Sequence, residues 1–265
     1  MTLTPGKLIL AATPTWNPTF IETSLWLDAA DASTITESGG SVSQWDDKSG
    51  NGRNATQSTP ASRPTLTTSN LNNLDVITFD GSDDVLIATL NTGLSSSFAF
   101  FTVVVPLRTN AIEAYVTSQV SSYNNYWANL GLGGVAGGQK ETFSLYDGTN
   151  NPISENISPS IGSPYLYAGV RDTTSGNIQL FSNGTQVVIA SDTTTSVPVY
   201  SDLQIGGQTV PANRYANARI AEVIVVSSLP TTIVRQKIEG YLAHKWGLTT
   251  NLPANHPYKT VEPTP

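Results

Sequence analysis

The chain of 265 residues contains no cysteine, only two histidines and only 12% charged residues. Without cysteine, neither disulfides nor thiolate metal sites can form, so a hydrophobic core alone must hold the fold. A helical bundle would need many more Glu, Lys and Leu residues than this chain offers. These absences exclude a disulfide-stabilised scaffold and argue against an all-helical protein.

Positive charge and long apolar runs are also scarce. Lys and Arg number 13 against 20 Asp and Glu, which gives a net charge of −7. Because the basic residues are scattered singly, they form no patch for a phosphate backbone, and nucleic acid is not an expected partner. The apolar run Leu8-Ile9-Leu10 is shorter than the apolar core of a signal peptide, about 7 to 15 residues, so we expect neither such export nor a membrane partner.

Short apolar runs separated by Ser, Thr, Asn and Gly make up most of the chain, and hydrophobic residues total 38%. This texture predicts an all-β domain over residues 23–258, between an N-terminal arm, 1–22, and a tail, 259–265. Strands are expected at 24–28, 76–79, 98–107, 142–146, 165–171, 178–181, 186–190, 203–205 and 218–226.

Three local signals are sharper than the rest. The run 98–105 is apolar on both alternating faces, which predicts an interior strand with both sides covered. Asn183-Gly184 predicts a type I′ hairpin turn. A helix is expected at 231–246, because Thr231 or Thr232 can cap it, apolar residues follow at spacings of three or four, and Gly247 can end it.

The arm combines prolines, which disfavour regular structure, with more apolar side chains than a solvated tail carries. We expect it to pack on its own domain, a neighbouring subunit or a larger assembly. A homo-oligomer is expected as well. The predicted assembly contacts are Leu8, Ile9, Leu10, Trp16 and Phe20.

Several short motifs follow one another in a fixed order. They are LWLDAAD at 25–31, WDDKSGNG at 45–52, FDG at 79–81, LFSNGT at 180–185, LQIG at 203–206, IAEVIV at 220–225, RQKIEGYLAHKWG at 235–247 and LPANHPY at 252–258. Together they resemble laminin-G-like domains of the concanavalin A-like lectin/glucanase superfamily, of the kind found in phage structural proteins and large bacterial surface proteins. The resemblance implies an all-β jelly roll: a two-sheet antiparallel β-sandwich with one short C-terminal helix.

Such sandwiches occur in lectins, adhesion modules, glycanases and virion appendages, so the fold alone leaves the function open. We expect a non-enzymatic virion protein, docked on shell or tail proteins through the arm, whose domain binds cell-surface glycans. The alternatives are a secreted or surface-anchored bacterial adhesion module and, third, a glucanase-like hydrolase. Catalysis is disfavoured because the chain has no Gly-x-Ser-x-Gly, no His-Glu-x-x-His and no closely spaced Glu pattern.

A candidate glycan face lies in a predicted loop or edge strand at 121–129, where aromatic rings alternate with side-chain amides. The alternative is that Tyr126 and Trp127 pack under the Gly-rich segment 131–140, which is predicted to be a flexible connection. The candidate ligand residues are Tyr123, Asn125, Tyr126, Trp127 and Asn129, with Arg214 and Tyr215 as a second face.

Two acidic turns are candidate calcium sites, because closely spaced oxygen-bearing side chains can surround Ca²⁺. Their oxygens also suit hydrogen bonds that stabilise turns, and that alternative stays open. The first turn lacks the acid of an EF-hand at its twelfth position, where Ser58 stands. The candidate ligands are Asp47, Ser49 and Asn51 in the first turn, and Asp80, Asp83 and Asp84 in the second.

Overall fold

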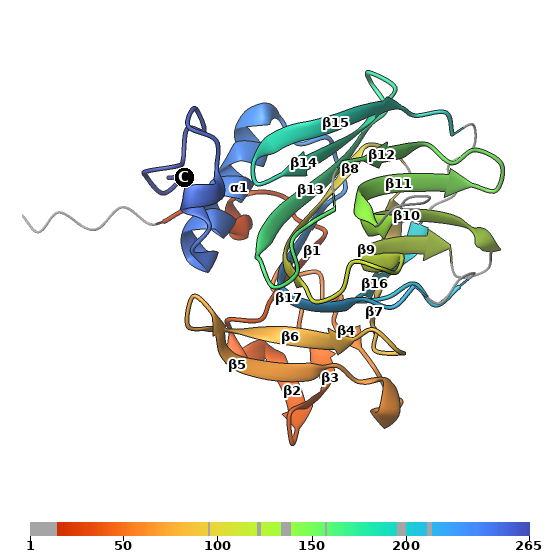
Figure 1. The fold of residues 1–265 in the computed structure, drawn as a ribbon, viewed down its shortest axis with the longest axis vertical. Coiled ribbons are helices and arrows are strands. Elements are labelled where there is room, and N and C mark those ends of the chain that lie inside the picture. Colours follow the sequence, from red (N-terminus) through yellow and green to blue (C-terminus); the bar gives the residue numbers. More distant parts are fainter. Residues whose placement is uncertain are drawn as a thin grey trace, which may run out of the picture.

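The structure is a computed structural model that describes residues 15–94, 96–120, 123–133, 139–156, 158–194, 200–210 and 214–265. Its strands pair only in the antiparallel sense and form two layers, a front and a back sheet (Figure 1). The predicted two-sheet antiparallel β-sandwich is therefore confirmed.

The front sheet runs in the order β12–β11–β10–β9–β16–β7. Its strands are β7 Leu86–Leu94, β9 Glu113–Val120, β10 Tyr123–Gly133, β11 Lys140–Asp147, β12 Ile153–Glu155 and β16 Tyr200–Ile205.

The back sheet runs β15–β14–β13–β8–β17, and the far side of β17 pairs with β1 and β6. Its strands are β1 Leu25–Asp28, β6 Leu74–Asp80, β8 Phe98–Pro106, β13 Tyr165–Asp172, β14 Asn177–Ser182, β15 Thr185–Ser191 and β17 Asn217–Val226.

Four further strands join the two sheets at one end, drawn in orange at the bottom of Figure 1. They are β2 Ile35–Ser38, β3 Ser41–Trp45, β4 Ala55–Thr56 and β5 Thr65–Leu71. The helices are α1 Thr232–Trp246 and the 3₁₀ turns Pro18–Phe20, Ala32–Thr34, Pro60–Ser62 and Thr249–Asn251.

Strand β8 is buried along its whole length because each of its faces meets a different core. Phe98 and Phe100 point between the sheets, where Phe143 meets both rings edge-on. Phe101 and Val103 point the other way, toward the helix. This confirms the predicted interior strand, since successive side chains of a strand alternate between its faces.

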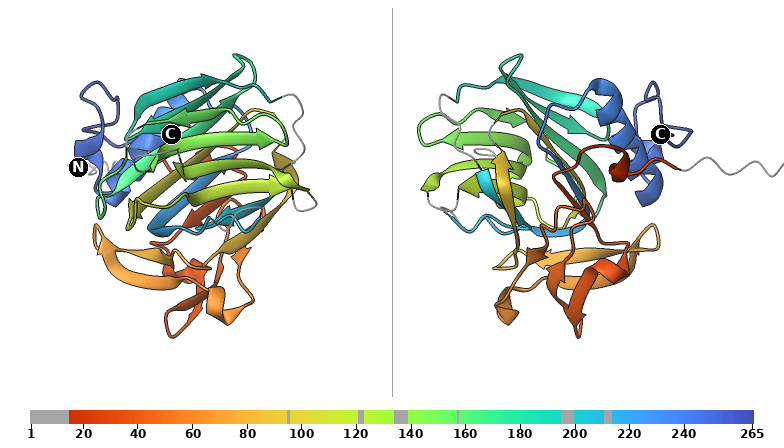
Figure 2. Two further views of the ribbon diagram at one scale, coloured as in Figure 1. Left: turned by 45° about the vertical axis from the view of Figure 1, so that its right-hand side comes forward. Right: turned by 180° about the vertical axis from the view of Figure 1, so that it is seen from behind.

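Helix α1 covers the outer face of the back sheet (Figure 2). Its apolar side, with Ile238, Leu242 and Trp246, packs on outward side chains of β8 and β17. Trp16 of the arm is buried in the same core and contacts the ring of Tyr241 edge-on. Trp16, one of the five predicted assembly contacts, thus packs on its own domain, because an exposed indole would leave a large apolar area in water.

The remaining arm residues divide into two groups. Phe20 ends the 3₁₀ turn Pro18–Phe20 and is 46% exposed. This turn contradicts the expectation of no regular structure in the arm, because the Asn17 side chain accepts a hydrogen bond from Thr19 N and caps it. Leu8, Ile9 and Leu10 lie outside the described residues.

A buried carboxylate, Glu222 of β17, joins the helix to the sheet. It accepts hydrogen bonds from Trp26 Nε1 at 2.7 Å, Tyr241 OH at 2.9 Å and Trp246 Nε1 at 2.7 Å. The ammonium of Lys245 lies 2.8 Å from the same carboxylate. Burial raises the pKa of Glu222, and Lys245 opposes that shift. All donors to this group come from β1 and α1.

The same ammonium also contacts Asp28, at 2.5 Å, and Lys48 lies 2.8 Å from the other oxygen of Asp28. The motif LWLDAAD and the closing helix, far apart in sequence, therefore meet in one ion-pair network.

All nine predicted strands are present, with ends shifted by no more than three residues. Asn183 and Gly184 both have positive φ, 48° and 76°, as a type I′ turn requires. Thr231 caps α1 by accepting from Val234 N, and Gly247 ends the helix at φ 73°.

Seven strands were not predicted: β2, β3, β4, β5, β7, β9 and β12. Of the segment 121–129, expected to be a loop or an edge strand, residues 123–129 are part of β10, which pairs with β9 on one side and β11 on the other and is therefore not an edge strand. The expected flexible connection at 131–140 is wrong at both ends, since residues 131–133 continue β10 and Lys140 begins β11. Neighbouring strands can order glycines that carry no strand signal of their own.

Glu222→Gln should lower the free energy of unfolding by about 3 kcal/mol. The neutral amide cannot balance the charge of Lys245, and its NH₂ group would face the hydrogen-bond donors of Trp26 and Trp246. Urea unfolding followed by tryptophan fluorescence measures the change. Glu22→Gln, the same substitution at an exposed residue, should leave stability nearly unchanged. An E222Q protein with the wild-type unfolding midpoint would contradict the role of this carboxylate.

Candidate functional site

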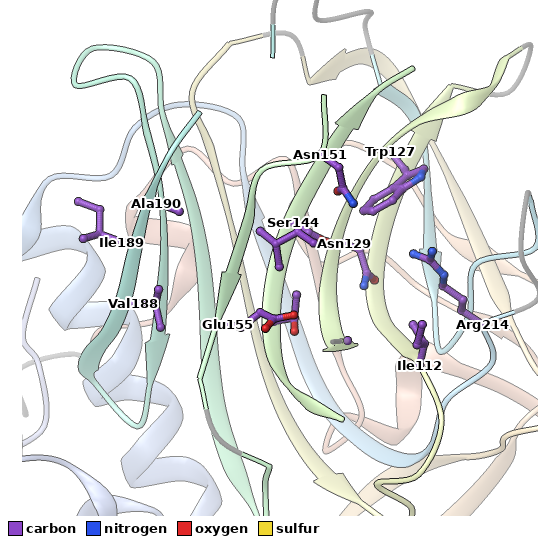
Figure 3. Close-up of a pocket in the computed structure, with 13 residues that line it drawn as sticks. Ile112, Trp127, Asn129, Ser144, Asn151, Glu155, Val188, Ile189, Ala190 and Arg214 are labelled. Atoms are coloured by element: carbon purple, nitrogen blue, oxygen red, sulfur yellow. The ribbon is translucent and has the colours of Figure 1, made fainter. Parts of the chain in front are cut away.

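A groove of about 670 Å³ lies on the outer face of the front sheet, where β12 approaches β15 of the back sheet (Figure 3). Strand alternation builds it, since every second residue of β10 and β11 points outward while Leu130 and Phe143 point into the core. Its lining residues are Ile112, Trp127, Asn129, Gly133, Thr142, Ser144, Asn151, Ile153, Glu155, Val188, Ile189, Ala190 and Arg214.

The floor of the groove is polar. Asn129, Thr142 and Ser144 stand side by side on β10 and β11, where Asn129 pairs with Ser144 in register. The side-chain oxygen of Asn129 accepts a hydrogen bond from Thr117 Oγ1 at 2.9 Å. That bond fixes the orientation of the amide, and the residue is 2% exposed.

The rim of the groove is largely apolar. Ile112 is 39% exposed and Ile153 is 40% exposed, and Val188 adds a half-buried side chain from β15. Apolar rims beside polar floors suit ligands that carry both C–H faces and hydroxyl groups.

Trp127 contributes to the wall but is only 6% exposed. Arg214 lies over its ring, 4.9 Å from the centroid, and the ring of Tyr146 packs against it with centroids 5.6 Å apart. Trp127 is therefore enclosed by Arg214 and Tyr146 and is not an open stacking platform.

Arg214 is held beside Trp127 by its backbone and its side chain. Its N–H donates to Gln208 O at 3.0 Å, and its guanidinium Nη1 donates to Gln208 Oε1 at 3.2 Å. Burial lowers the pKa of Arg214, because removal from water disfavours its charged form.

The structure thus joins Trp127, Asn129 and Arg214, which the sequence assigned to two separate faces. Tyr215 does not line this groove; its carbonyl accepts a hydrogen bond from Arg108 Nη2 at 2.9 Å. The side chains of Tyr123, Asn125 and Tyr126 lie outside the described residues.

Sequence reasoning missed Asn151, Ile153 and Glu155 of the groove. Ile153 and Glu155 belong to a three-residue strand between turn residues, a pattern too short to predict. Their place in the site depends on the pairing of β12 with β11, which no local signal specifies.

In the first acidic turn, the side chains bond to nearby backbone. The carboxylate of Asp47 accepts from the backbone N–H groups of Trp26, Ser49 and Arg53 at 2.9–3.0 Å. Asn51 donates to the carbonyl of Thr23 at 2.9 Å. These bonds are those of the turn alternative, in which the loop ties β1 to the strands that follow.

In the second acidic turn, the carboxylates of Asp80, Asp83 and Asp84 come within 4.8 Å of one another. Asp80 accepts from Ser82 N at 2.7 Å, and Asp84 accepts from Asp80 N at 2.9 Å. Burial and the two neighbouring acids raise the pKa of Asp84 to about 6. Calcium binding at this turn stays a prediction.

Within the part of the chain that the structure covers, no helix has the length and apolar character needed to span a membrane.

The fold and groove define an antiparallel β-sandwich with an open front face. No protein-family model and no curated protein sequence matches the chain. Among solved structures, the chain is similar to domain 4 of an extracellular arabinanase of family GH43 from Geobacillus stearothermophilus, solved with arabinotriose. The TM-score is 0.57 at 13% identity, over 80% of this chain and 95% of that domain.

Two further similarities are of the same kind. A native heptameric pentraxin from Limulus polyphemus matches with a TM-score of 0.50 at 14% identity, over 62% of this chain and 81% of the pentraxin. A sialidase from Trypanosoma rangeli, in complex with sialic acid, matches with a TM-score of 0.53 at 12% identity, over 88% of this chain but only 36% of the sialidase. At these identities, the similarities establish the sandwich fold.

Asp84→Asn should stabilise the protein more at pH 7.5 than at pH 4.5. The folded-state pKa of Asp84, about 6, lies above the ordinary aspartate value of 3.8. The folded wild type therefore binds the proton more tightly than the unfolded chain, and its stability falls as the pH rises through this window. Asparagine does not ionise, so the variant avoids this decrease in the free energy of unfolding, which we expect to be about 1–2 kcal/mol. Urea unfolding at both pH values, with Glu22→Gln as control, measures it; a pH-independent difference would contradict the assignment.

Proposed function

We propose that the chain is a non-catalytic display protein of a virion, whose sandwich binds host-surface glycans through the groove on the front sheet. The observation that carries the glycan-binding part is the composition of the groove. Amide and hydroxyl groups form its floor and isoleucine side chains its rim, so a sugar ring can meet both kinds of surface at once.

The small number of carboxylates in the groove favours binding over cleavage. Glu155 is the one acidic residue among its described lining residues. Glycosidases use two carboxyl groups, about 5–10 Å apart, on either side of the bond that they break. A single carboxylate at one side of the groove offers no such pair.

The placement of the arm supports the display part of the proposal. The N-terminal end of the described chain runs beside α1, where Trp16 N donates to Pro263 O at 3.2 Å. Helix α1 lies on the outer face of the back sheet (Figures 1 and 2). The groove is lined by outward side chains of the front sheet. A protein docked on shell or tail proteins through its arm would present the groove away from them.

The similar structures add general support. The arabinanase domain was solved with arabinotriose and the sialidase with sialic acid. Several copies on one particle, as a homo-oligomer or an array, would convert weak binding by each groove into strong attachment. A bacterial adhesion module would use the same groove and differ in what the arm contacts.

The double variant Asn129→Ala/Asn151→Ala should weaken binding to the glycans that the wild-type chain selects on a glycan array by about 10-fold or more, since both amides lose their bonds to hydroxyls. Calorimetric titration gives the affinities. Asn255→Ala, an exposed asparagine outside the groove, serves as the matched control. Equal affinity of the double variant and the wild type, or a blank array, would contradict glycan binding at this site.

Deletion of residues 1–14 should abolish attachment to particles that lack the protein, because it removes Leu8, Ile9 and Leu10. The deletion keeps Trp16, so the second core stays filled and the melting temperature should match that of the full chain. Co-sedimentation with purified particles measures attachment. Equal sedimentation of both proteins would overturn the role of the arm.

A further inference from the structure

The charge of Arg214 is not balanced by any carboxylate. All Asp and Glu residues of the chain lie within the described residues, and none of the ion pairs found there involves Arg214. Six other cationic side chains do pair with carboxylates, namely Lys48, Arg108, Lys140, Arg171, Arg235 and Lys245. Arg214 is the cation that lines the groove, and its partner there is the neutral Gln208.

The guanidinium is also fixed in place before any ligand arrives. Its backbone bonds to Gln208 in both directions, and its carbonyl accepts from Ala114 N at 3.2 Å. Its plane is held over Trp127. Figure 3 shows Arg214 on the same side of the groove as Trp127, Asn129 and Asn151. A preorganised donor loses little conformational entropy when it binds.

Partial burial makes this arrangement costly in the free protein. A guanidinium stays protonated at neutral pH, so Arg214 holds a charge that is partly removed from water without a counter-ion. An anion that enters the groove would offset this cost. The groove should therefore prefer anionic ligands, a preference that its amides and isoleucines alone would not give.

We infer that the groove selects sugars that carry a carboxylate, and that Arg214 recognises it. This inference rests on the proposed glycan-binding function. The planar fork of N–H groups matches the two oxygens of a carboxylate, and Nη1 alone is engaged by Gln208. Asn129 and Asn151 line the same groove and would bind hydroxyls of that sugar.

Glu155 limits the number of charges that the ligand can carry. It stands on β12, and its ion pair with Lys140 is long, 3.6 Å, with both side chains partly exposed. The negative charge of Glu155 would repel a second anionic group at this side of the groove. The net charge of −7 disfavours polyanions in general. The preferred ligand has one carboxylate per bound unit and not a dense run of sulfates.

The test begins with a glycan array that holds carboxylated, sulfated and neutral sugars. Calorimetry then compares matched pairs: 3′-sialyllactose with lactose, and trigalacturonic acid with its methyl ester. The variants are Arg214→Gln, Arg214→Lys and, as a control on the helix side, Lys237→Gln. Melting curves check that each variant folds.

We expect carboxylated sugars to dominate the array and to lose at least about 10-fold in affinity with R214Q or on esterification. R214K should lie between R214Q and wild type, because an ammonium keeps the charge but not the fork. K237Q should match wild type.

Three results would overturn the inference. Neutral sugars that bind as tightly as carboxylated ones, unaffected by R214Q, would refute it and leave glycan binding intact. Sulfated sugars that bind where carboxylated ones do not would also refute it. A blank array would refute both the inference and the proposed function.

Discussion

The buried carboxylate of Glu222 holds helix α1 against the outer face of the back sheet. An ionised group without partners in the interior costs several kcal/mol, so its donors must all be in place when the protein folds. Three of those donors, Tyr241, Lys245 and Trp246, belong to α1, and the fourth, Trp26, belongs to β1. The helix cannot leave the back sheet without exposing or stripping this group. Helix α1 is thereby fixed on the outer face of the back sheet, and the groove described above lies on the front sheet.

Strand alternation decides which side chains of the front sheet face the groove. Inward positions of β10 and β11 supply Leu130 and Phe143 to the core, and outward positions supply Asn129, Thr142 and Ser144 to the groove. Arg214, which precedes β17, adds a fixed cation at one side of the groove. Trp16 and Pro263 lie on the opposite side, next to the back sheet, so the proposed function would place attachment behind and recognition in front.

Sequence patterns predicted the parts whose signals are local. A few consecutive residues suffice to predict each of three features: the doubly apolar strand β8, the Asn183-Gly184 turn and the Thr231 cap. Strands such as β5, with sequence TLTTSNL, and the Gly-containing end of β10 carry no such signal, because pairing with neighbours decides them. The site divides in the same way. Trp127, Asn129 and Arg214 were named from residue type, but their union with Asn151 and Glu155 follows from strand pairing across the front sheet, which a single sequence does not encode locally.

The central claim is that ligand binding takes place in the front groove. Backbone NMR of isotope-labelled protein, titrated with the tightest sugar from the array, tests it most directly. Chemical-shift changes should cluster on residues 127–133, 142–144, 151–155 and 214, and α1 should stay silent. Changes confined to α1, to the acidic turn at 80–84 or to no part of the protein would contradict the account.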